Sequence, residues 1–316
     1  MEKFQKIVDK LNAFLLEYCK SNRAVLDIAI KDLINGGGKR LRPILVILAG
    51  RFGKVDLDKL LSIAAGIELL HMATLVHDDI IDEARLRRGE ITAQERFGKN
   101  VAVFVGDYLL AKSYTLFTDH LSRHSLMKLN KIVRLVCAGE IDQFEGKYSI
   151  DLSIYDYFKR IRRKTALLFA ISTYMGAHES GVRDKPLYHL YNFALEIGMT
   201  FQIQDDLLDF VGQEKKTGKK IGQDLAAGIY TLPIICLMKS DEYRAQTREI
   251  LTRDSITEDE IQLITEMVYD NNAFEESKTL GQKFLDKAVD NLNQLPDIEA
   301  KNDLKYILDW QLKRQI

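Results

Sequence analysis

Long stretches of this sequence repeat apolar residues every three or four positions, which is the spacing of one face of an α-helix. The clearest stretch covers residues 57–76. The residues of its repeating face are Leu60, Ile63, Ala64, Ile67, Leu70 and Thr74. Only four prolines occur in 316 residues, so few positions would interrupt a helix. This patterning predicts an all-α fold.

The same pattern predicts further helices along the chain. Four are long and cover residues 100–121, 126–144, 154–175 and 185–210. Four more are shorter or more exposed and cover residues 232–239, 256–269, 274–292 and 302–312. The sequence shows no convincing series of alternating strands and no hairpin of the Asn-Gly type. No segment rich in proline, glycine or serine divides the chain, so we expect residues 1–316 to form a single domain.

Composition narrows the class of protein. Hydrophobic residues make up 46% of the chain, which suits a globular protein with a sizeable core. The formal net charge of −1 argues against a nucleic-acid partner, because nucleic-acid binders are usually strongly basic. Three scattered cysteines, Cys19, Cys137 and Cys236, form no CxxC pattern and fit a reducing compartment. The N-terminus lacks the apolar core of a signal peptide, and no apolar run approaches the roughly eighteen residues of a membrane span. We expect a cytoplasmic protein without a transmembrane segment.

An Asp-Asp-x-x-Asp motif occurs twice, each time at the end of a long apolar helix. Its members are Asp78, Asp79 and Asp82 in the first copy, and Asp205, Asp206 and Asp209 in the second. A helix C-terminus carries partial negative charge, so acidic side chains there are unfavourable by about 0.3–1 kcal/mol each. Mg²⁺ would resolve this conflict, because it takes oxygen ligands and usually binds one or two carboxylates together with substrate phosphates. If the two helices face each other, six carboxylates would converge on one cavity that needs several Mg²⁺ ions and a polyanionic substrate.

Basic residues accompany the aspartates. They are Lys39 and Arg42 after three glycines, Arg87 and Arg88 after the first motif, Lys164 within a helix, and Lys219 after the second motif. Guanidinium groups bind phosphate through two parallel hydrogen bonds, and ammonium groups bind it as point charges. The GxxxxGK[ST] and GxGxxG patterns of nucleotide-binding loops are absent, so nucleotide binding has no support.

Seven motifs, in a fixed order, make this chain similar to the trans-isoprenyl diphosphate synthases of the longer-chain, polyprenyl type. They read GGKRLRP (37–43), HMATLVHDDIID (71–82), RRG (87–89), GDYLLAK (106–112), KTA (164–166), FQIQDDLLDF (201–210) and GKKIGQDLAAGIYTLP (218–233). The resemblance implies a single-domain bundle of long helices around a deep central cavity. It also implies a homodimer, although the catalytic half of a heterodimer is an open alternative.

The resemblance further implies roles for individual residues. The six aspartates would hold about three Mg²⁺ ions on an allylic diphosphate. The other contacts to that diphosphate would come from Arg87, Lys164, Thr165, Gln202 and Lys219. Isopentenyl diphosphate, bound without Mg²⁺, would contact Lys39, Arg42, His71 and Arg88. The allylic C–O bond would ionise, the isopentenyl double bond would attack the allylic carbon, and the oxygens of Thr165 and Gln202 would face the developing cation.

Two positions depart from the family's usual pattern. Ile91 stands where members commonly have proline, so the turn after Arg88 is expected to differ. Many members also carry a lysine two residues before Thr-Leu-Pro, but residues 228–233 contain none. Either the allylic diphosphate is bound by one cation fewer, or Lys219 and Lys220 suffice.

Three other classes of protein remain as alternatives. A di-iron bundle oxidase needs two ExxH motifs, and only Glu68 to His71 provides one. A terpene cyclase would share the metal chemistry, but Lys39, Arg42 and Arg88 argue against a single-substrate enzyme. A non-catalytic subunit of a two-component synthase should lack the aspartates, whereas this chain has all six.

Product length depends on the residues before the first aspartate motif. Thr74 and Ala73 lie four and five positions before Asp78, and Leu70 lies one turn deeper. In the family, bulky aromatic residues at the first two positions stop growth early, whereas Ala73 and Thr74 are small. Deeper candidates for a cavity floor are Phe104, Tyr108, Tyr114 and Phe117. We expect a hexa- to octaprenyl diphosphate, a precursor of quinone side chains; the alternative is a shorter geranylgeranyl or farnesyl product.

Overall fold

The computed structural model describes residues 2–211, 221–253 and 255–313. Over these ranges the chain is helical apart from loops and one two-stranded hairpin, which confirms the all-α class. The chain folds into two compact units. Unit 1 comprises residues 1–129, 172–188 and 298–304, and unit 2 comprises residues 130–171, 189–297 and 305–316. The chain mostly crosses from one unit to the other within a helix. The boundaries between the units are therefore not marked by a linker in the sequence.

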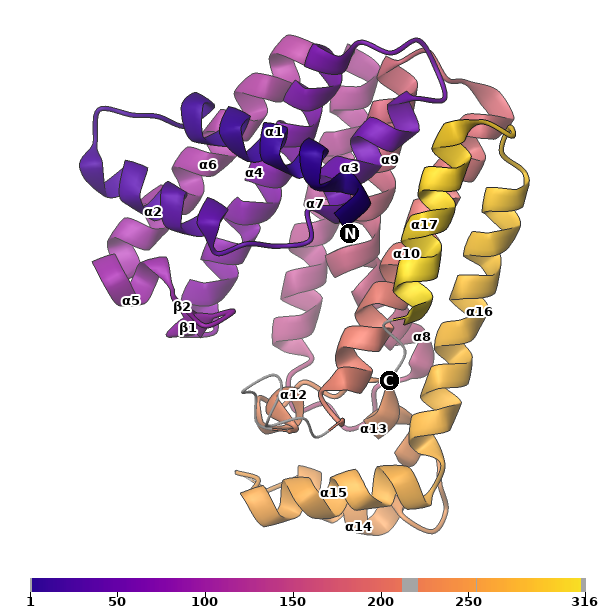
Figure 1. Cartoon of the computed structure of the whole chain (residues 1–316). Helices are drawn as coiled ribbons and strands as arrows, with labels where there is room; N and C mark the ends of the chain where they lie inside the picture. The colour runs from indigo at the N-terminus through magenta and orange to yellow at the C-terminus, as the bar shows by residue number, and fades with distance from the viewer. Residues whose placement is uncertain (1, 212–220, 254, 314–316) are drawn as a thin grey trace. The chain divides into compact units, whose positions relative to one another are not determined.

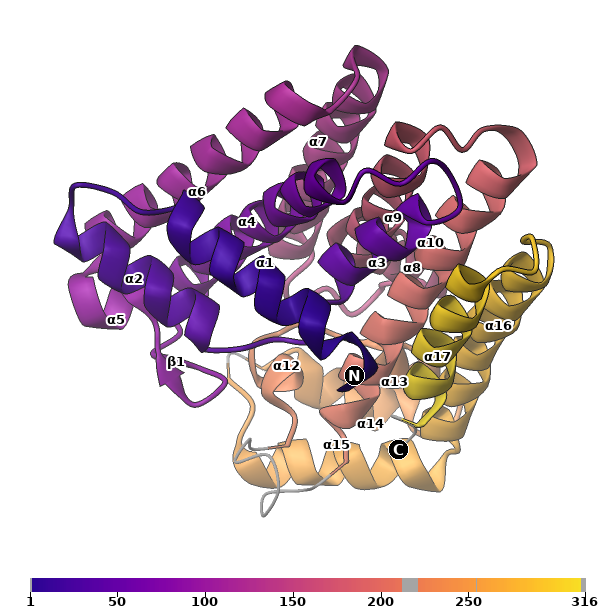
Figure 2. The ribbon, with the colours of Figure 1, turned by 45° about the horizontal axis from the view of Figure 1, so that its top comes forward.

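Unit 1 is built around one long helix. Its elements are η1 (Glu2–Phe4), α1 (Gln5–Tyr18), α2 (Ala24–Asn35), α3 (Leu41–Gly50), α4 (Leu57–Ile81), β1 (Leu86–Arg87), β2 (Glu90–Ile91), α5 (Ala93–Phe97) and α6 (Lys99–His120). Helix α4 packs along α6 and against α3, and α1 and α2 lie alongside α4 and α6 (Figures 1 and 2). Asp56 begins α4, because its side chain accepts a hydrogen bond from the backbone N–H of Lys59 at 3.0 Å.

Helix α4 corrects one expectation from the sequence. It is long and apolar enough to cross a membrane by length and composition, so the expectation that no apolar run approaches this length is wrong. However, 72% of its most apolar window is buried inside the protein. A helix that is apolar all round is typical of a protein core as well as of a membrane, and neighbouring helices cover α4 here.

Several helices contribute residues to both units or belong to unit 2. They are α7 (Arg123–Glu145), α8 (Ile154–Ile161), η2 (Arg162–Ala166), α9 (Leu167–Glu179), α10 (Asp184–Leu208), α12 (Gln223–Ala226), α13 (Leu232–Leu237), α14 (Arg244–Leu251), α15 (Glu258–Asp270), α16 (Ala273–Asn293) and α17 (Glu299–Lys313). Within unit 2, α13 packs against α16, and α15 lies across one end of α16 (Figure 1).

All nine helices predicted from periodicity are confirmed, with ends that differ by a few residues. One predicted helix differs in its geometry: residues 154–175 form α8 and α9 with a π-helix, η2, between them. The ranges predicted from periodicity did not include α1, α2, α3, α5, α12 and α14. Helix α3 is buried along almost its whole length, so its apolar residues do not alternate with polar ones. Helices α5 and α12 are too short to show a period.

A β-hairpin follows α4, although the sequence gave no Asn-Gly signal for one. Arg88 and Gly89 form its two-residue turn with φ values of 55° and 83°, which is the conformation of a type I′ turn. Leu86 pairs with Ile91, and the N–H of Thr92 donates to the carbonyl of Arg85 at 3.0 Å. Because hydrogen-bonded pairs alternate along a hairpin, the N–H of Ile91 points away from β1. The hairpin therefore does not use the one N–H group that a proline at position 91 would lack.

Candidate active site

The first aspartate motif forms the end of α4. Asp82 caps the helix, Glu83 follows with φ 50°, and the N–H of Ala84 donates to the carbonyl of Asp79 at 2.9 Å. This is the Schellman ending of a helix. It leaves the side chain of Asp82 exposed and that of Asp78 half-buried, whereas Asp79 is only 4% exposed.

Asp79 is held by the protein itself. Its Oδ1 lies 2.6 Å from Nε of Arg87, and Nε2 of Gln94 donates to its backbone carbonyl at 2.6 Å. Burial raises the pKa of the Asp79 carboxyl, and this effect exceeds the opposing effect of Arg87. The structure thus brings the predicted metal ligand Asp79 and the predicted diphosphate contact Arg87 together as an ion pair. Gln94, which the sequence did not indicate, ties the hairpin region to the end of α4.

Two of the predicted isopentenyl diphosphate residues, Arg42 and Arg88, lie near a third, His71. Nη1 of Arg42 lies 3.0 Å from Nε2 of His71. Burial is the largest cause that lowers the pKa of His71 well below its usual value, followed by the positive charges of Arg42 and Arg88. A neutral imidazole accepts a hydrogen bond from Arg42 through Nε2. The guanidinium groups are therefore close enough to His71 to create a local positive potential.

The glycines before Lys39 make room for Arg88. Nη1 of Arg88 donates to the carbonyl of Gly37, and a Cβ at Gly38 would lie 2.6 Å from the same Nη1. Gly37 and Gly38 both have positive φ values. Lys39, next along the chain, is exposed. Three of the predicted residues, Lys39, Arg42 and Arg88, thus belong to one loop-and-hairpin region of unit 1.

Arg40, between the predicted ligands Lys39 and Arg42, has a different role. It is buried, pairs with Glu68, and donates from Nη2 to the carbonyl of Ile34 at 2.8 Å. Glu68 was also half of the ExxH match that a di-iron centre would need. Because its carboxylate is occupied by Arg40, the structure gives the di-iron alternative no support.

The second aspartate motif lies at the end of α10 in unit 2. Asp205 and Asp209 are half-buried, and Asp206 is 4% exposed. Oδ1 and Oδ2 of Asp209 accept the N–H groups of Gln223 and Asp224, each at 3.1 Å. Asp209 thus caps the start of α12.

Asp206 is enclosed by two hydrogen-bond donors. The hydroxyl of Tyr157 donates to Oδ2 at 2.6 Å, and Nε2 of Gln202 donates to Oδ1 at 2.8 Å. Burial, aided by the negative charge of Asp224, raises the pKa of Asp206 to about 7 despite these donors. The middle aspartate is therefore buried and partnered in both motifs.

The predicted residues Lys164 and Thr165 lie in the π-helix η2. Nζ of Lys164 is 2.9 Å from Oε2 of Glu140 on α7, and the hydroxyl of Thr165 donates to Oε1 of Gln202 at 2.6 Å. A Cβ at Gly139 would lie 2.7 Å from Cβ of Arg163, so this glycine permits the close approach of α7 to η2. π-helical turns are frequent at functional sites. Lys219, the remaining predicted contact, lies outside the described residues.

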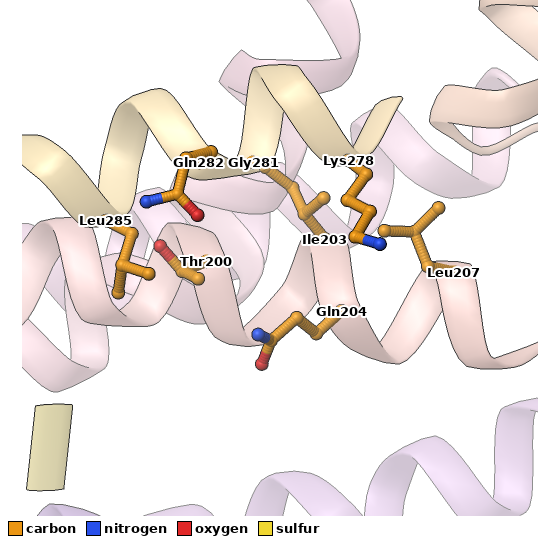
Figure 3. Close-up of a pocket in the computed structure, with 8 residues that line it drawn as sticks. All are labelled: Thr200, Ile203, Gln204, Leu207, Lys278, Gly281, Gln282 and Leu285. Carbon is orange, nitrogen blue, oxygen red and sulfur yellow. The ribbon is translucent and has the colours of Figure 1, made fainter. Parts of the chain in front are cut away.

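Helix α10 carries its aspartates on the face opposite to the one that contacts α16. A cleft against α16 is lined on α10 by Thr200, Ile203, Gln204 and Leu207 (Figure 3). Gln202, Asp205, Asp206 and Asp209 lie about half a turn away by the 100° advance of each helical residue. The contact with α16, made by both polar and apolar residues, leaves the aspartates on the other side of α10.

The residues proposed to control product length all lie in unit 1. Leu70 and Ala73 are buried, and Thr74 is half-buried with its hydroxyl donating to the carbonyl of His71 at 2.8 Å. Among the deeper candidates, Phe117 is fully buried and would meet any Cβ at Gly66, whereas Phe104 is 66% exposed within the chain.

The donor set fits Mg²⁺ as a hard cation. Within the described ranges, no three or more His, Cys, Asp or Glu side chains form a ready-made metal cluster. Asp78 and Asp82 nevertheless offer accessible carboxylates one helical turn apart, and Mg²⁺ commonly takes one or two carboxylates plus phosphate oxygens and water. This arrangement suits a metal that enters together with a phosphorylated substrate.

Comparisons with known proteins agree with these features. Residues 23–268 match the family model described as "Polyprenyl synthetase". Heptaprenyl diphosphate synthase component 2 of Bacillus subtilis (strain 168) is 37% identical over 308 residues, 98% of this chain and 88% of that protein. The crystal structure of heptaprenyl diphosphate synthase from Staphylococcus aureus has 34% identity and a TM-score of 0.92, covering 98% of this chain and 97% of that one.

A third relative was crystallised with ligands. The polyprenyl synthase of Caulobacter crescentus CB15, complexed with calcium and isoprenyl diphosphate, has 29% identity and a TM-score of 0.91 over 100% of this chain and 97% of that one. The family match covers more than half of the chain, and the relatives are matched over nearly their whole length. This chain therefore belongs to the polyprenyl synthetase family and is a prenyl-transferring enzyme.

Proposed function

We propose that this chain joins an allylic diphosphate to isopentenyl diphosphate and forms an all-trans polyprenyl diphosphate. The observation that carries the proposal is the repeated arrangement of the aspartates. In each motif the middle carboxylate is buried and held by a side-chain donor, whereas the outer ones are exposed or half-buried; Asp209 also accepts two backbone N–H groups of α12. We further propose that units 1 and 2 together form one catalytic domain in which both motifs act on the same diphosphate.

The allylic diphosphate would be bound through Mg²⁺, about three ions, on the aspartates. Bound Mg²⁺ would supply Lewis-acid stabilisation of the leaving diphosphate. Asp78, Asp82 and Asp205 are the more accessible ligands, and Asp209 would bind through the oxygens that now accept the N–H groups of Gln223 and Asp224. Asp79 and Asp206 would have to exchange their present partners before they could bind a metal directly.

The cationic side chains would complete the diphosphate site. Lys164 would turn from Glu140 toward the leaving diphosphate, with Arg87 and Lys219 as further contacts. The released diphosphate would accept the final proton, so no side-chain base is required. Helices that exclude water from the cavity would protect the allylic cation.

Isopentenyl diphosphate would bind beside His71. Its diphosphate would be held by the positive charges of Lys39, Arg42 and Arg88, since guanidinium groups bind phosphate through paired hydrogen bonds. Neutral His71 would orient Arg42 through the contact at 3.0 Å. A site of three cations needs no metal to balance the substrate, in keeping with isopentenyl diphosphate binding without Mg²⁺.

The product is proposed to be a hexa- to octaprenyl diphosphate that serves as a quinone side-chain precursor in the cytoplasm. Two observations support the length. Ala73 and Thr74 are small, and the relatives from Bacillus subtilis and Staphylococcus aureus are heptaprenyl diphosphate synthases by name. The second candidate is a shorter, geranylgeranyl or farnesyl product.

Assembly is the second open feature of the function. The family resemblance favours a homodimer, whereas the words "component 2" in the name of the Bacillus subtilis relative favour the catalytic half of a heterodimer. We propose that the chain carries the whole chemical site in either case, because the aspartates and cations named above all belong to it.

One assay tests the function and its alternatives. The purified chain is incubated with farnesyl diphosphate, Mg²⁺ and labelled isopentenyl diphosphate, and the dephosphorylated products are separated by length. We expect long all-trans products only when isopentenyl diphosphate is present. Cyclised hydrocarbon formed without isopentenyl diphosphate would support a terpene cyclase instead. A folded but inactive chain that gains activity with a partner subunit would support the heterodimer.

A further inference from the structure

Four polar side chains of unit 2 form a continuous hydrogen-bonded chain. The Thr165 hydroxyl donates to Oε1 of Gln202 at 2.6 Å, and Nε2 of Gln202 donates to Oδ1 of Asp206 at 2.8 Å. The Tyr157 hydroxyl donates to the other carboxylate oxygen of Asp206 at 2.6 Å. Tyr157 is fully buried, and Asp206 and Thr165 are nearly so. Sequence motifs identify three of these residues, but Tyr157 lies in none of them.

The chemistry of the groups sets the direction of this chain. Both carboxylate oxygens of Asp206 accept hydrogen bonds here, and an amide has one donating and one accepting end. Gln202 must therefore turn its NH₂ group toward Asp206 and its carbonyl toward Thr165. The Thr165 hydroxyl donates its single hydrogen to that carbonyl. The lone pairs of the Thr165 oxygen therefore face away from Gln202. The hydrogen bond to Asp206 therefore orients the Gln202 side chain so that its carbonyl oxygen lies beside Thr165.

The backbone brings the four residues together through the π-helix. Tyr157 on α8 and Thr165 on η2 are eight residues apart, which would separate them by about 80° in a regular α-helix. A π-turn contains more residues than an α-turn, so η2 reduces this separation and turns both side chains toward α10. Gly198 of α10 allows the approach, because a Cβ there would lie 2.6 Å from Cα of Ala166.

We propose that Tyr157 is a positioning residue for prenyl transfer, which acts by holding Asp206 so that Gln202 and Thr165 present oxygen atoms to the allylic cation. This inference rests on the proposed function of Thr165 and Gln202. It also gives Asp206 the task of orienting Gln202 in place of direct metal binding. Oxygen dipoles fixed before the reaction stabilise a developing positive charge at no cost of reorganisation.

The test removes the Tyr157 hydroxyl alone. Tyr157→Phe is compared with Tyr230→Phe, a matched control in the same unit, because Tyr230 is also buried and donates its hydroxyl to the carbonyl of Leu251 at 3.2 Å. Steady-state turnover is measured with farnesyl and isopentenyl diphosphates, and helix content by circular dichroism. We expect Tyr157→Phe to lower kcat about tenfold, equivalent to about 1.4 kcal/mol, with both KM values within about twofold of wild type. Tyr230→Phe should leave kcat unchanged.

A double-mutant cycle separates positioning from general destabilisation. If Tyr157 acts through Gln202, adding Tyr157→Phe to a Gln202→Ala variant should change kcat by less than about twofold, because the oriented amide is already gone. An equal loss of kcat in both backgrounds would overturn the proposal, as would a loss that Tyr230→Phe reproduces. Wild-type enzyme is assayed in parallel: if it elongates farnesyl diphosphate neither alone nor with a partner subunit, the proposed function fails, whereas a failure confined to the variants concerns Tyr157 alone.

Discussion

Nε of Arg87 lies 2.6 Å from Oδ1 of Asp79, so the second aspartate of the first motif has its counter-ion within the protein. The second motif repeats this arrangement with different partners, because Asp206 accepts from Tyr157 and Gln202. Both middle aspartates are 4% exposed. The two copies of the motif thus share one feature: the middle carboxylate is buried and held by side-chain donors, whereas the outer carboxylates are exposed or half-buried.

The Arg87–Asp79 pair predicts a stability effect that is separate from substrate binding. Arg87→Ala would leave a buried carboxylate without its partner and should lower the free energy of unfolding by about 2 kcal/mol. The double variant Arg87→Ala/Asp79→Asn should recover most of this loss, because the uncompensated charge is removed. Urea unfolding without substrate measures both. Arg88→Ala, which removes the exposed neighbouring arginine, is the control, and an equal cost for both arginines would contradict the prediction.

The metal proposal predicts that each aspartate motif is indispensable. Asp78→Ala and Asp205→Ala should each lose several orders of magnitude in kcat, because the leaving diphosphate loses a metal ligand, while circular dichroism shows unchanged helix content. Chelation of Mg²⁺ should abolish wild-type turnover, and added Mg²⁺ should restore it. Asp290→Ala, which removes an exposed acid from α16, should be fully active. Near-normal turnover in either folded motif variant would refute the metal site.

The cluster around His71 predicts which substrate each cation binds. Arg42→Ala should raise the KM for isopentenyl diphosphate by at least about tenfold and change the KM for farnesyl diphosphate little, because Arg42 lies beside His71. Initial rates with one substrate varied and the other saturating give both constants. Lys31→Ala removes an exposed positive charge from α2 of the same unit and should change neither. The reverse pattern for Arg42→Ala would mean that the two diphosphate sites are exchanged.

The proposal about product length predicts that larger side chains near Asp78 give shorter products. Thr74→Phe and Ala73→Phe should shorten the product, because an aromatic ring would block the growing chain. Ala73 is 1% exposed, so Ala73→Phe also risks overpacking of about 1–3 kcal/mol, and Thr74→Phe at the half-buried neighbour is the safer variant. Chain-length analysis of the products measures the outcome. An unchanged length in an active, folded Thr74→Phe enzyme would place the limit elsewhere along the cavity.

The hydrogen bonds of Glu179 predict that the stability of unit 1 decreases at acidic pH. Its carboxylate accepts from Lys59, Ser122 and Ser125. Burial acts to raise its pKa, but these donors together lower it from 4.5 to about 2.

A depressed folded-state pKa means that the stabilisation is fully present above pH 4.5 and is lost as the pH falls toward 2. Glu179→Gln should therefore lower the free energy of unfolding at pH 7 by up to about 3 kcal/mol, and the difference from wild type should shrink below pH 4.5. Urea unfolding at several pH values measures this. A difference that is constant with pH would show that the charge of Glu179 is not the cause.

The sequence by itself determined the helical class, the positions of nine helices, both aspartate motifs and the cations that accompany them. These features depend on local chemistry: apolar periodicity follows from the geometry of one helix, and paired aspartates at a helix end conflict with the helix dipole in any fold. The residues predicted to bind isopentenyl diphosphate were identified through the family resemblance, because each belongs to one of its short motifs.

Only the tertiary structure decided which member of each motif faces inward and what holds it. Arg40 and Arg42 are two residues apart, yet one is buried against Glu68 and the other lies beside His71. Tyr157 reaches Asp206 across 49 positions of sequence, helped by a π-turn that has no periodic signature. Burial and partnership of a side chain depend on contacts between distant segments, and a local pattern carries no information about those contacts.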